Sequence, residues 1–279
     1  TAHRARPRRT LVIAPGHTFA GEPLQQLIVD QRITHANLTP TVLATLSPEL
    51  APLTLVAAGE SLPAALVDKW SAHRVFNGYG PTELTVGVSV AGPLRGGGKP
   101  SIGVPVAGAT AHVLDARLHP VPAGTVGELY VSGSGLARGY RNRSADTAIR
   151  FVADPFGAPG DRLYRTGDLV RIDAHGELDH VGRADDQVQI HGIRVEPAEV
   201  DAVLLSDPHV DATVTVPTAG VLAAYVQGTA SIESLRRRLA AHLPRHLRPA
   251  SITVVDAMPF TTSGKIDRAA LPSPDAPAV

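Results

Sequence analysis

The sequence predicts an α/β protein with a large α/β plus β-barrel-like N-terminal domain and a small α+β C-terminal domain. Three observations predict this fold class. Apolar runs alternate with helical patterns over the first 80 residues, short strands with turn signals follow, and a separate α+β pattern fills the last third of the chain. Alternating strands and helices indicate βαβ units and a parallel sheet, whereas a series of short strands indicates a barrel or a sandwich.

The first part of the chain has the strand–helix alternation of a parallel sheet. Apolar runs ended by Gly or Pro predict strands, and apolar residues at helical spacing predict helices. We expect strands at residues 10–14, 33–38, 53–58 and 75–76, and helices at residues 21–32, 40–46 and 63–71.

From about residue 86 the pattern changes to short strands, which we expect at residues 111–114, 128–132, 169–172 and 177–180. Beyond a boundary near residues 183–185 we expect strands at 187–190, 212–216, 221–226 and 252–255 and helices at 196–205 and 232–242. The predicted domains are therefore residues 1–182 and 183–272, followed by a proline-rich linker at 273–279.

The composition excludes several classes of protein. The chain of 279 residues has a formal net charge of zero, which gives no general attraction to nucleic acid or to an anionic membrane. It has no cysteine, so disulfides, Cys-ligated zinc and thiol nucleophiles are excluded. No apolar run is long enough to span a membrane, and no signal-peptide pattern opens the sequence. We expect a soluble, cytoplasmic protein.

A glycine-rich turn, Gly-Tyr-Gly-Pro-Thr-Glu at residues 78–83, follows a predicted strand. Ligands of open α/β sheets bind at the carboxyl ends of the strands. Tyr79 could lie against a base next to Gly80, Thr82 could contact a phosphate oxygen, and Glu83 could bind Mg²⁺. The alternative is an ordinary turn in which Glu83 is a charge at the start of a helix.

Two further acidic motifs are candidates for a nucleotide site. Asp168 follows a glycine turn in Tyr-Arg-Thr-Gly-Asp (164–168), where a carboxylate can accept both ribose hydroxyls or can simply cap the turn. Arg183 and Asp185 lie at the predicted domain boundary. Arg183 could pair with phosphate or ribose and Asp185 could be a hinge, or both could belong to a solvated linker.

The segment Thr-Ser-Gly-Lys-Ile-Asp-Arg at residues 262–268 is not a phosphate-binding P-loop. A P-loop requires Gly at the position of Pro259 and Ser or Thr at the position of Ile266. Lys265 is instead a single cation, suited to stabilising charge that develops at phosphorus, or else a surface lysine.

The order of these motifs closely resembles the adenylate-forming superfamily, and within it the adenylation domains of nonribosomal peptide synthetases. The segment Arg-Phe-Val-Ala-Asp-Pro-Phe-Gly at residues 150–157 is similar to the peptide-synthetase branch in particular. The resemblance extends from about residue 10 to residue 272. It rests on residues 78–83, 127–140, 164–168, 182–196 and 263–268.

The resemblance implies a role for each matched residue. Tyr79 stacks on adenine, Thr82 contacts the α-phosphate region and Glu83 binds Mg²⁺. Asp168 holds the ribose hydroxyls with support from Arg183. The remaining roles are a hinge at Asp185 and, at Lys265, a bridge between the substrate carboxylate and the nucleotide.

The reaction implied is the conversion of an amino acid and MgATP to aminoacyl-AMP and pyrophosphate, followed by transfer to the phosphopantetheine of a carrier protein. The implied partners are that carrier and neighbouring synthetase domains. The family's Ser/Thr/Gly-rich phosphate loop would lie upstream of Thr10, so the chain resembles an N-terminally truncated member. We therefore expect little adenylation activity from this chain alone.

The resemblance also implies a substrate pocket whose lining is small and uncharged. Such a lining leaves room for a large side chain and would leave a charged one without a partner, so we expect a neutral, bulky amino acid, aromatic ones included. Two alternatives stay open: an acyl- or aryl-CoA ligase, and a non-catalytic docking module with the adenylation fold. The implied pocket residues are Asn37, Val56, Ala58, Gly78, Val86 and Gly87.

Overall fold

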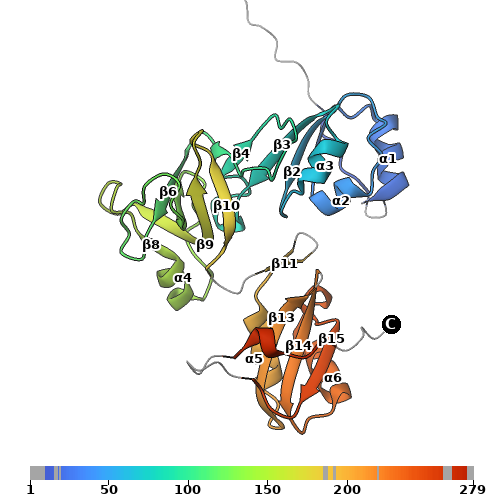
Figure 1. The fold of residues 1–279 in the computed structure, drawn as a ribbon, viewed down its shortest axis with the longest axis vertical. Coiled ribbons are helices and arrows are strands. Elements are labelled where there is room, and N and C mark those ends of the chain that lie inside the picture. The colour runs from blue at the N-terminus through green and yellow to red at the C-terminus, as the bar shows by residue number, and fades with distance from the viewer. Residues whose placement is uncertain are drawn as a thin grey trace, which may run out of the picture. The chain divides into compact units, whose positions relative to one another are not determined.

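The computed structural model describes residues 10–15, 18, 20–184, 188–190, 193–218, 220–259 and 266–274. The chain divides into two compact units, Thr1–Ala184 and Asp185–Val279 (Figure 1). Each unit has its own hydrophobic core. Within the described residues, no helix combines the length and the apolar character needed to cross a membrane.

The first unit begins with a five-stranded sheet in the order β1-β2-β3-β4-β5. The strands β1 (His35–Leu38), β2 (Thr54–Ala58) and β3 (Arg74–Tyr79) are parallel. β4 (Ser89–Ala91) and β5 (Val104–Pro105) are antiparallel additions. The prediction of parallel strands is therefore confirmed for β1, β2 and β3.

Three helices cover one face of this sheet. They are α1 (Gly21–Asp30), α2 (Pro40–Ala44) and α3 (Ala64–Lys69) (Figure 1). α2 begins where expected, because Thr39 caps it by accepting from the Val42 amide and Pro40 fits the first turn. The helices share a core with the inward side chains of the strands, around the fully buried Trp70.

A second antiparallel sheet follows, in the order β10-β9-β7-β6, with β8 also paired to β9. It is the strand-rich section that the sequence predicts after residue 86. Its longest strand, β9, continues through Gly167, whose positive φ of 78° interrupts the regular strand just before Asp168. The elements are η1 (Thr82–Leu84), β6 (Ala109–Leu114), β7 (Gly127–Gly133), α4 (Ser144–Arg150), β8 (Phe151–Ala153), β9 (Arg162–Ile172) and β10 (Leu178–Arg183).

The second unit is an α+β structure built on the sheet β13-β14-β15. β13 and β14 are antiparallel, whereas β14 and β15 are parallel. Apolar residues of α5, α6 and the sheet form one buried cluster that includes Leu204, Leu235 and Leu239. The elements are β11 (Val188–Ile190), β12 (Ile193–Val195), α5 (Pro197–Leu205), β13 (Val210–Thr218), β14 (Val221–Gly228), α6 (Ile232–His242), η2 (Arg245–Leu247), β15 (Ser251–Val255) and η3 (Arg268–Ala270).

One predicted strand is wrong. Residues 10–14 form no regular element, and Leu11 and Ile13 are 86% and 81% exposed. An apolar run becomes a buried strand only where neighbours cover it, and these two side chains lie uncovered.

Candidate active site

The predicted turn at residues 78–83 lies at the carboxyl end of β3, as the sequence indicates. Gly80 is required there, because a Cβ at this position would lie 2.3 Å from the carbonyl oxygen of Val86. η1 then begins at Thr82, which is exposed, and continues through Glu83, which is 9% exposed. Two adjacent residues of η1 therefore differ in exposure: the Thr82 hydroxyl is at the surface, and the Glu83 carboxylate is nearly buried.

Asp168 is the centre of a polar cluster formed by β3, β9 and β10. The Tyr79 hydroxyl donates to Asp168 Oδ2 at 2.5 Å, and Arg183 Nη1 donates to Oδ1 at 2.8 Å. His180 Nε2 lies 3.2 Å from the same Oδ1. Three of the predicted nucleotide-site residues, Tyr79, Asp168 and Arg183, are therefore in direct contact.

The electrostatics of this cluster keep Asp168 ionised. Burial alone would raise the pKa of the Asp168 carboxyl, but the hydrogen bond from His180 and the positive charge of Arg183 outweigh it and lower that pKa. Burial and the negative charge of Asp168 raise the pKa of the Tyr79 hydroxyl well above its ordinary value. At neutral pH the cluster therefore contains a carboxylate beside a protonated phenol.

Local backbone geometry brings the cluster together. The register between β10 and β9 shifts between His180 and Gly182, and this irregularity allows His180 and Arg183 to approach the same carboxylate. In a regular strand, residues three apart point to opposite faces. On β9, Thr166 accepts a hydrogen bond from the Asp168 amide at 2.9 Å and so fixes the backbone before the carboxylate.

Glu83 has a partner that sequence reasoning missed. The Tyr140 hydroxyl donates a short hydrogen bond to Glu83 Oε1 and lies 3.4 Å from the Tyr164 hydroxyl. Burial, followed by the hydrogen bond to Glu83, raises the pKa of Tyr140. Tyr140 belongs to the Gly-Tyr pair that is part of the motif series, but its contact with Glu83 joins residues 57 positions apart and has no sequence signal.

Four of the six predicted pocket residues lie on one face of the first sheet. Val56 and Ala58 alternate with buried residues on β2, and a Cβ on Gly78 would lie 3.1 Å from Val56 Cγ1 and 3.4 Å from Ala58 Cβ. Asn37 is paired in register with Val56. Val86 lies outside these strands: it is 72% exposed on the turn after η1, beside Gly87.

Two predicted site residues, Lys265 and Asp185, lie outside the described residues.

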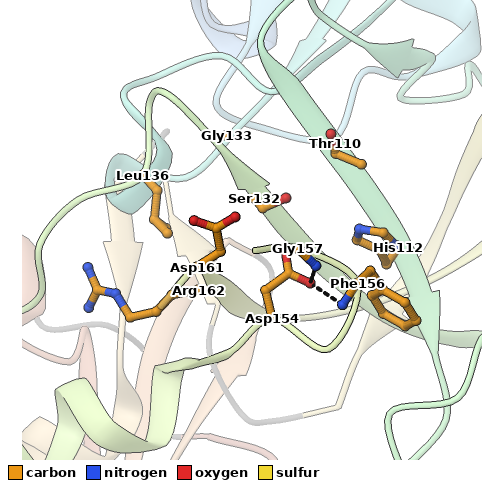
Figure 2. A pocket seen from close by; sticks show the side chains of 10 residues that line it. All are labelled: Thr110, His112, Ser132, Gly133, Leu136, Asp154, Phe156, Gly157, Asp161 and Arg162. Atoms are coloured by element: carbon orange, nitrogen blue, oxygen red, sulfur yellow. Dashed lines mark hydrogen bonds between the residues drawn. The ribbon is translucent and has the colours of Figure 1, made fainter. Parts of the chain in front are cut away.

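A cavity of about 440 Å³ lies elsewhere on the second sheet (Figure 2). None of the predicted site residues lines it. His112 and Phe156 stack on one side with ring centroids 4.6 Å apart, while Asp154 accepts hydrogen bonds from the backbone amides of Phe156 and Gly157. Leu136 and Arg162 form another part of the lining.

Comparison with known proteins identifies the family. The AMP-binding enzyme family matches residues 8–141. CymA of Salinispora arenicola, described as a probable non-canonical nonribosomal peptide synthetase, is 48% identical over 278 residues. Novobiocin biosynthesis protein H of Streptomyces niveus is 44% identical over 277 residues. The chain belongs to the AMP-binding family of adenylate-forming enzymes.

Solved adenylation enzymes show the same mixed α/β fold. PA1221, a nonribosomal peptide synthetase protein containing adenylation and PCP domains, matches with a TM-score of 0.76 and 31% identity, over 89% of this chain and 46% of that one. The two relatives above each match 95% of this chain, which spans 4% of CymA and 46% of the novobiocin protein. The chain therefore spans less than half of each of these three proteins.

Proposed function

We propose that this chain belongs to an amino-acid-activating adenylation domain and supplies part of its nucleotide and substrate sites. In the reaction, a carboxylate oxygen of the amino acid attacks the α-phosphorus of ATP and the bond to the β-phosphate oxygen breaks. Aminoacyl-AMP forms and pyrophosphate leaves. The phosphopantetheine thiol of a carrier protein then attacks the acyl carbon and displaces AMP. The synthetase relatives support this assignment.

The observation that carries the proposal is the cluster around Asp168. An ionised carboxylate on β9, in contact with Tyr79 at the carboxyl end of β3, suits the two hydroxyls of a ribose. Arg183 and His180 contact its Oδ1 from β10, and Tyr79, which contacts its Oδ2, is the aromatic residue we assign to the adenine. If Asp168 only capped a turn, its carboxylate would be needed, but three side chains from two other strands would not need to contact it.

The remaining roles follow the chemistry of each residue. Thr82 is exposed at the start of η1 and offers a hydroxyl to phosphate. Glu83 fits a Mg²⁺ site, because Mg²⁺ prefers oxygen ligands and is usually held by one or two carboxylates plus substrate phosphates. In the described residues no group of three or more His, Asp or Glu side chains could hold a metal alone, which agrees with a site completed by nucleotide. We assign charge stabilisation at the reacting centre to Lys265.

We propose a neutral, bulky amino acid as the substrate. The face formed by Asn37, Val56, Ala58 and Gly78 carries no charge, and Gly78 leaves space beside two small side chains. A charged substrate side chain would lose its hydration there without gaining a partner.

The domain roles are part of the same proposal. Residues 1–182 would be the C-terminal part of the large adenylation core, and residues 183–272 a small domain that swings about Asp185 and carries Lys265. Carrier protein and neighbouring synthetase domains are the proposed partners, supported by the adenylation–PCP architecture of PA1221.

The test is binding of AMP, without metal, by isothermal titration calorimetry. We expect Asp168→Asn to weaken AMP binding by roughly tenfold or more, since a hydrogen bond to a charged group contributes about 1.5–3 kcal/mol. The matched control is Asp179→Asn, which changes an aspartate on β10 that pairs with Arg171. Equal affinities for the two variants would refute the ribose assignment.

A further inference from the structure

The loop of residues 133–140, which starts at the last residue of β7, lies directly against η1. The Ala137 amide donates to the Glu83 carbonyl oxygen at 2.8 Å, and the Thr85 hydroxyl donates to the Gly135 carbonyl oxygen at 2.8 Å. A Cβ on Gly135 would lie 2.9 Å from the Leu84 carbonyl oxygen, so the approach is close enough to favour glycine. The loop therefore fixes the backbone at Glu83 and in the two residues that follow it.

The opposite side of the 133–140 loop is held by Arg162. Its Nη1 donates to the Arg138 carbonyl oxygen at 3.0 Å and its Nη2 to the Ala137 carbonyl oxygen at 3.4 Å. Figure 2 shows Leu136 of this loop together with Arg162, both in the lining of the cavity. The loop is thus fastened both to η1 and to the second sheet.

Tyr140, the last residue of this loop, is held from several directions. Its amide donates to Thr147 Oγ1 at 2.9 Å, and its ring packs edge-on against Phe151 with centroids 5.5 Å apart. Its hydroxyl lies 3.4 Å from the Tyr164 hydroxyl and donates to Glu83 Oε1. A rigid aromatic side chain thus presents one donor to one carboxylate oxygen.

We infer that Tyr140 is a positioning residue that orients the Glu83 carboxylate for the metal–nucleotide complex. The inference rests on the proposed function, in which Glu83 is the Mg²⁺ ligand. Mg²⁺ requires near-ideal octahedral geometry, so the direction of a ligand oxygen matters. Partners that orient a metal ligand typically contribute 10–100-fold to metal affinity. Tyr140 acts through Glu83 and touches no reacting atom.

The experiment measures Mn²⁺ binding by electron paramagnetic resonance in the presence of α,β-methylene-ATP, together with AMP binding without metal. We expect Tyr140→Phe to weaken Mn²⁺ binding by roughly tenfold, because the ring and its packing remain while the donor is lost. AMP affinity and the thermal unfolding midpoint should stay at their wild-type values, because the contacts of Asp168 are unchanged.

Tyr130→Phe is the matched control. Tyr130 is a buried tyrosine of the same unit whose hydroxyl lies 3.4 Å from Glu128 Oε2. We expect it to leave Mn²⁺ and AMP binding unchanged. If Tyr140→Phe does not fold, Tyr164→Phe removes the hydroxyl next to that of Tyr140, and a smaller weakening of Mn²⁺ binding is expected.

Three outcomes are decisive. Unchanged Mn²⁺ affinity in Tyr140→Phe, or in Tyr164→Phe if that variant must be used, overturns the positioning role. Equal losses of Mn²⁺ and AMP affinity overturn it as well, since they indicate a general structural defect. If Glu83→Gln binds Mn²⁺ as the wild type does, or the wild type does not bind it, the metal assignment of the proposed function fails and the inference fails with it.

Discussion

Asp168 illustrates, at the scale of one residue, how burial and neighbouring charge compete. The pKa of its carboxyl is lowered in the folded chain, so the group releases its proton more readily there than in the unfolded chain. The resulting stabilisation is present above the ordinary pKa of aspartate and is lost as pH falls through the lowered value. The hydrogen bond from His180 and the charge of Arg183 supply this stabilisation.

Gly78 gives a prediction about specificity. A side chain larger than hydrogen at this position would meet Val56 Cγ1 at 3.1 Å and fill the space that we assign to the substrate. Phenylalanyl-sulfamoyl-adenosine and glutamyl-sulfamoyl-adenosine can be compared as ligands by calorimetry. We expect the wild type to prefer the phenylalanyl compound, and Gly78→Val to reduce that preference by about tenfold, or roughly 1.4 kcal/mol.

The control for this experiment is AMP, which lacks the aminoacyl group and should bind the wild type and Gly78→Val equally. A wild-type preference for the glutamyl compound would contradict the proposed neutral pocket.

The sequence predicted several residues of the candidate site, but it did not predict all of the residues that contact them. Tyr79, Asp168 and Arg183 were all predicted, and the structure brings them into contact. The contribution of His180 could not be predicted, because it depends on a register shift in β10 that a period-two pattern does not contain. Tyr140 was missed because its contact with Glu83 depends on how a loop packs.

Among the elements, those with a clear apolar period were predicted most accurately. α6 spans Ile232–His242 as predicted, since Ser231 caps it and its apolar residues follow helical spacing. β9 was predicted as residues 169–172 but begins at Arg162, because a glycine at positive φ bends this strand without ending it. Short strands such as β4 and β5 carry too few residues for a periodic signal.

Gly103 gives a prediction at the scale of elements. It lies just before β5, its carbonyl accepts from the Leu178 amide on β10, and its φ is 75°. A Cβ there would lie 1.9 Å from the Val90 carbonyl oxygen on β4. We expect Gly103→Ala to lower the free energy of unfolding by about 3 kcal/mol or more, as left-handed backbone strain adds to overpacking.

Urea denaturation measures this loss. Gly98→Ala is the control, because its Cβ meets nothing within 4 Å and its φ is not positive, so we expect a change below about 0.5 kcal/mol. Similar stabilities for the two variants would show that the backbone at Gly103 can relax.

At the scale of the whole molecule, the chain consists of two units whose hydrophobic clusters do not share residues. The change of pattern after residue 182 indicated two domains, because the strands and helices expected beyond it form a complete α+β pattern of their own. Local sequence patterns describe how each core is filled, and they contain no information about how the two units are placed relative to each other.

Separate cores predict separate responses to a cavity. Leu235 on α6 is fully buried in the cluster of the second unit. We expect Leu235→Ala to reduce the stability of that unit by about 2–5 kcal/mol, through lost burial and the cavity left behind. Native-state hydrogen exchange should show faster opening of amides in α5, α6 and β14, while amides of β2 and β3 keep their wild-type rates.

Leu55→Ala, which opens a cavity in the first unit's cluster, should give the reverse pattern. Equal acceleration in both units for either variant would show that the two cores unfold as one cooperative structure.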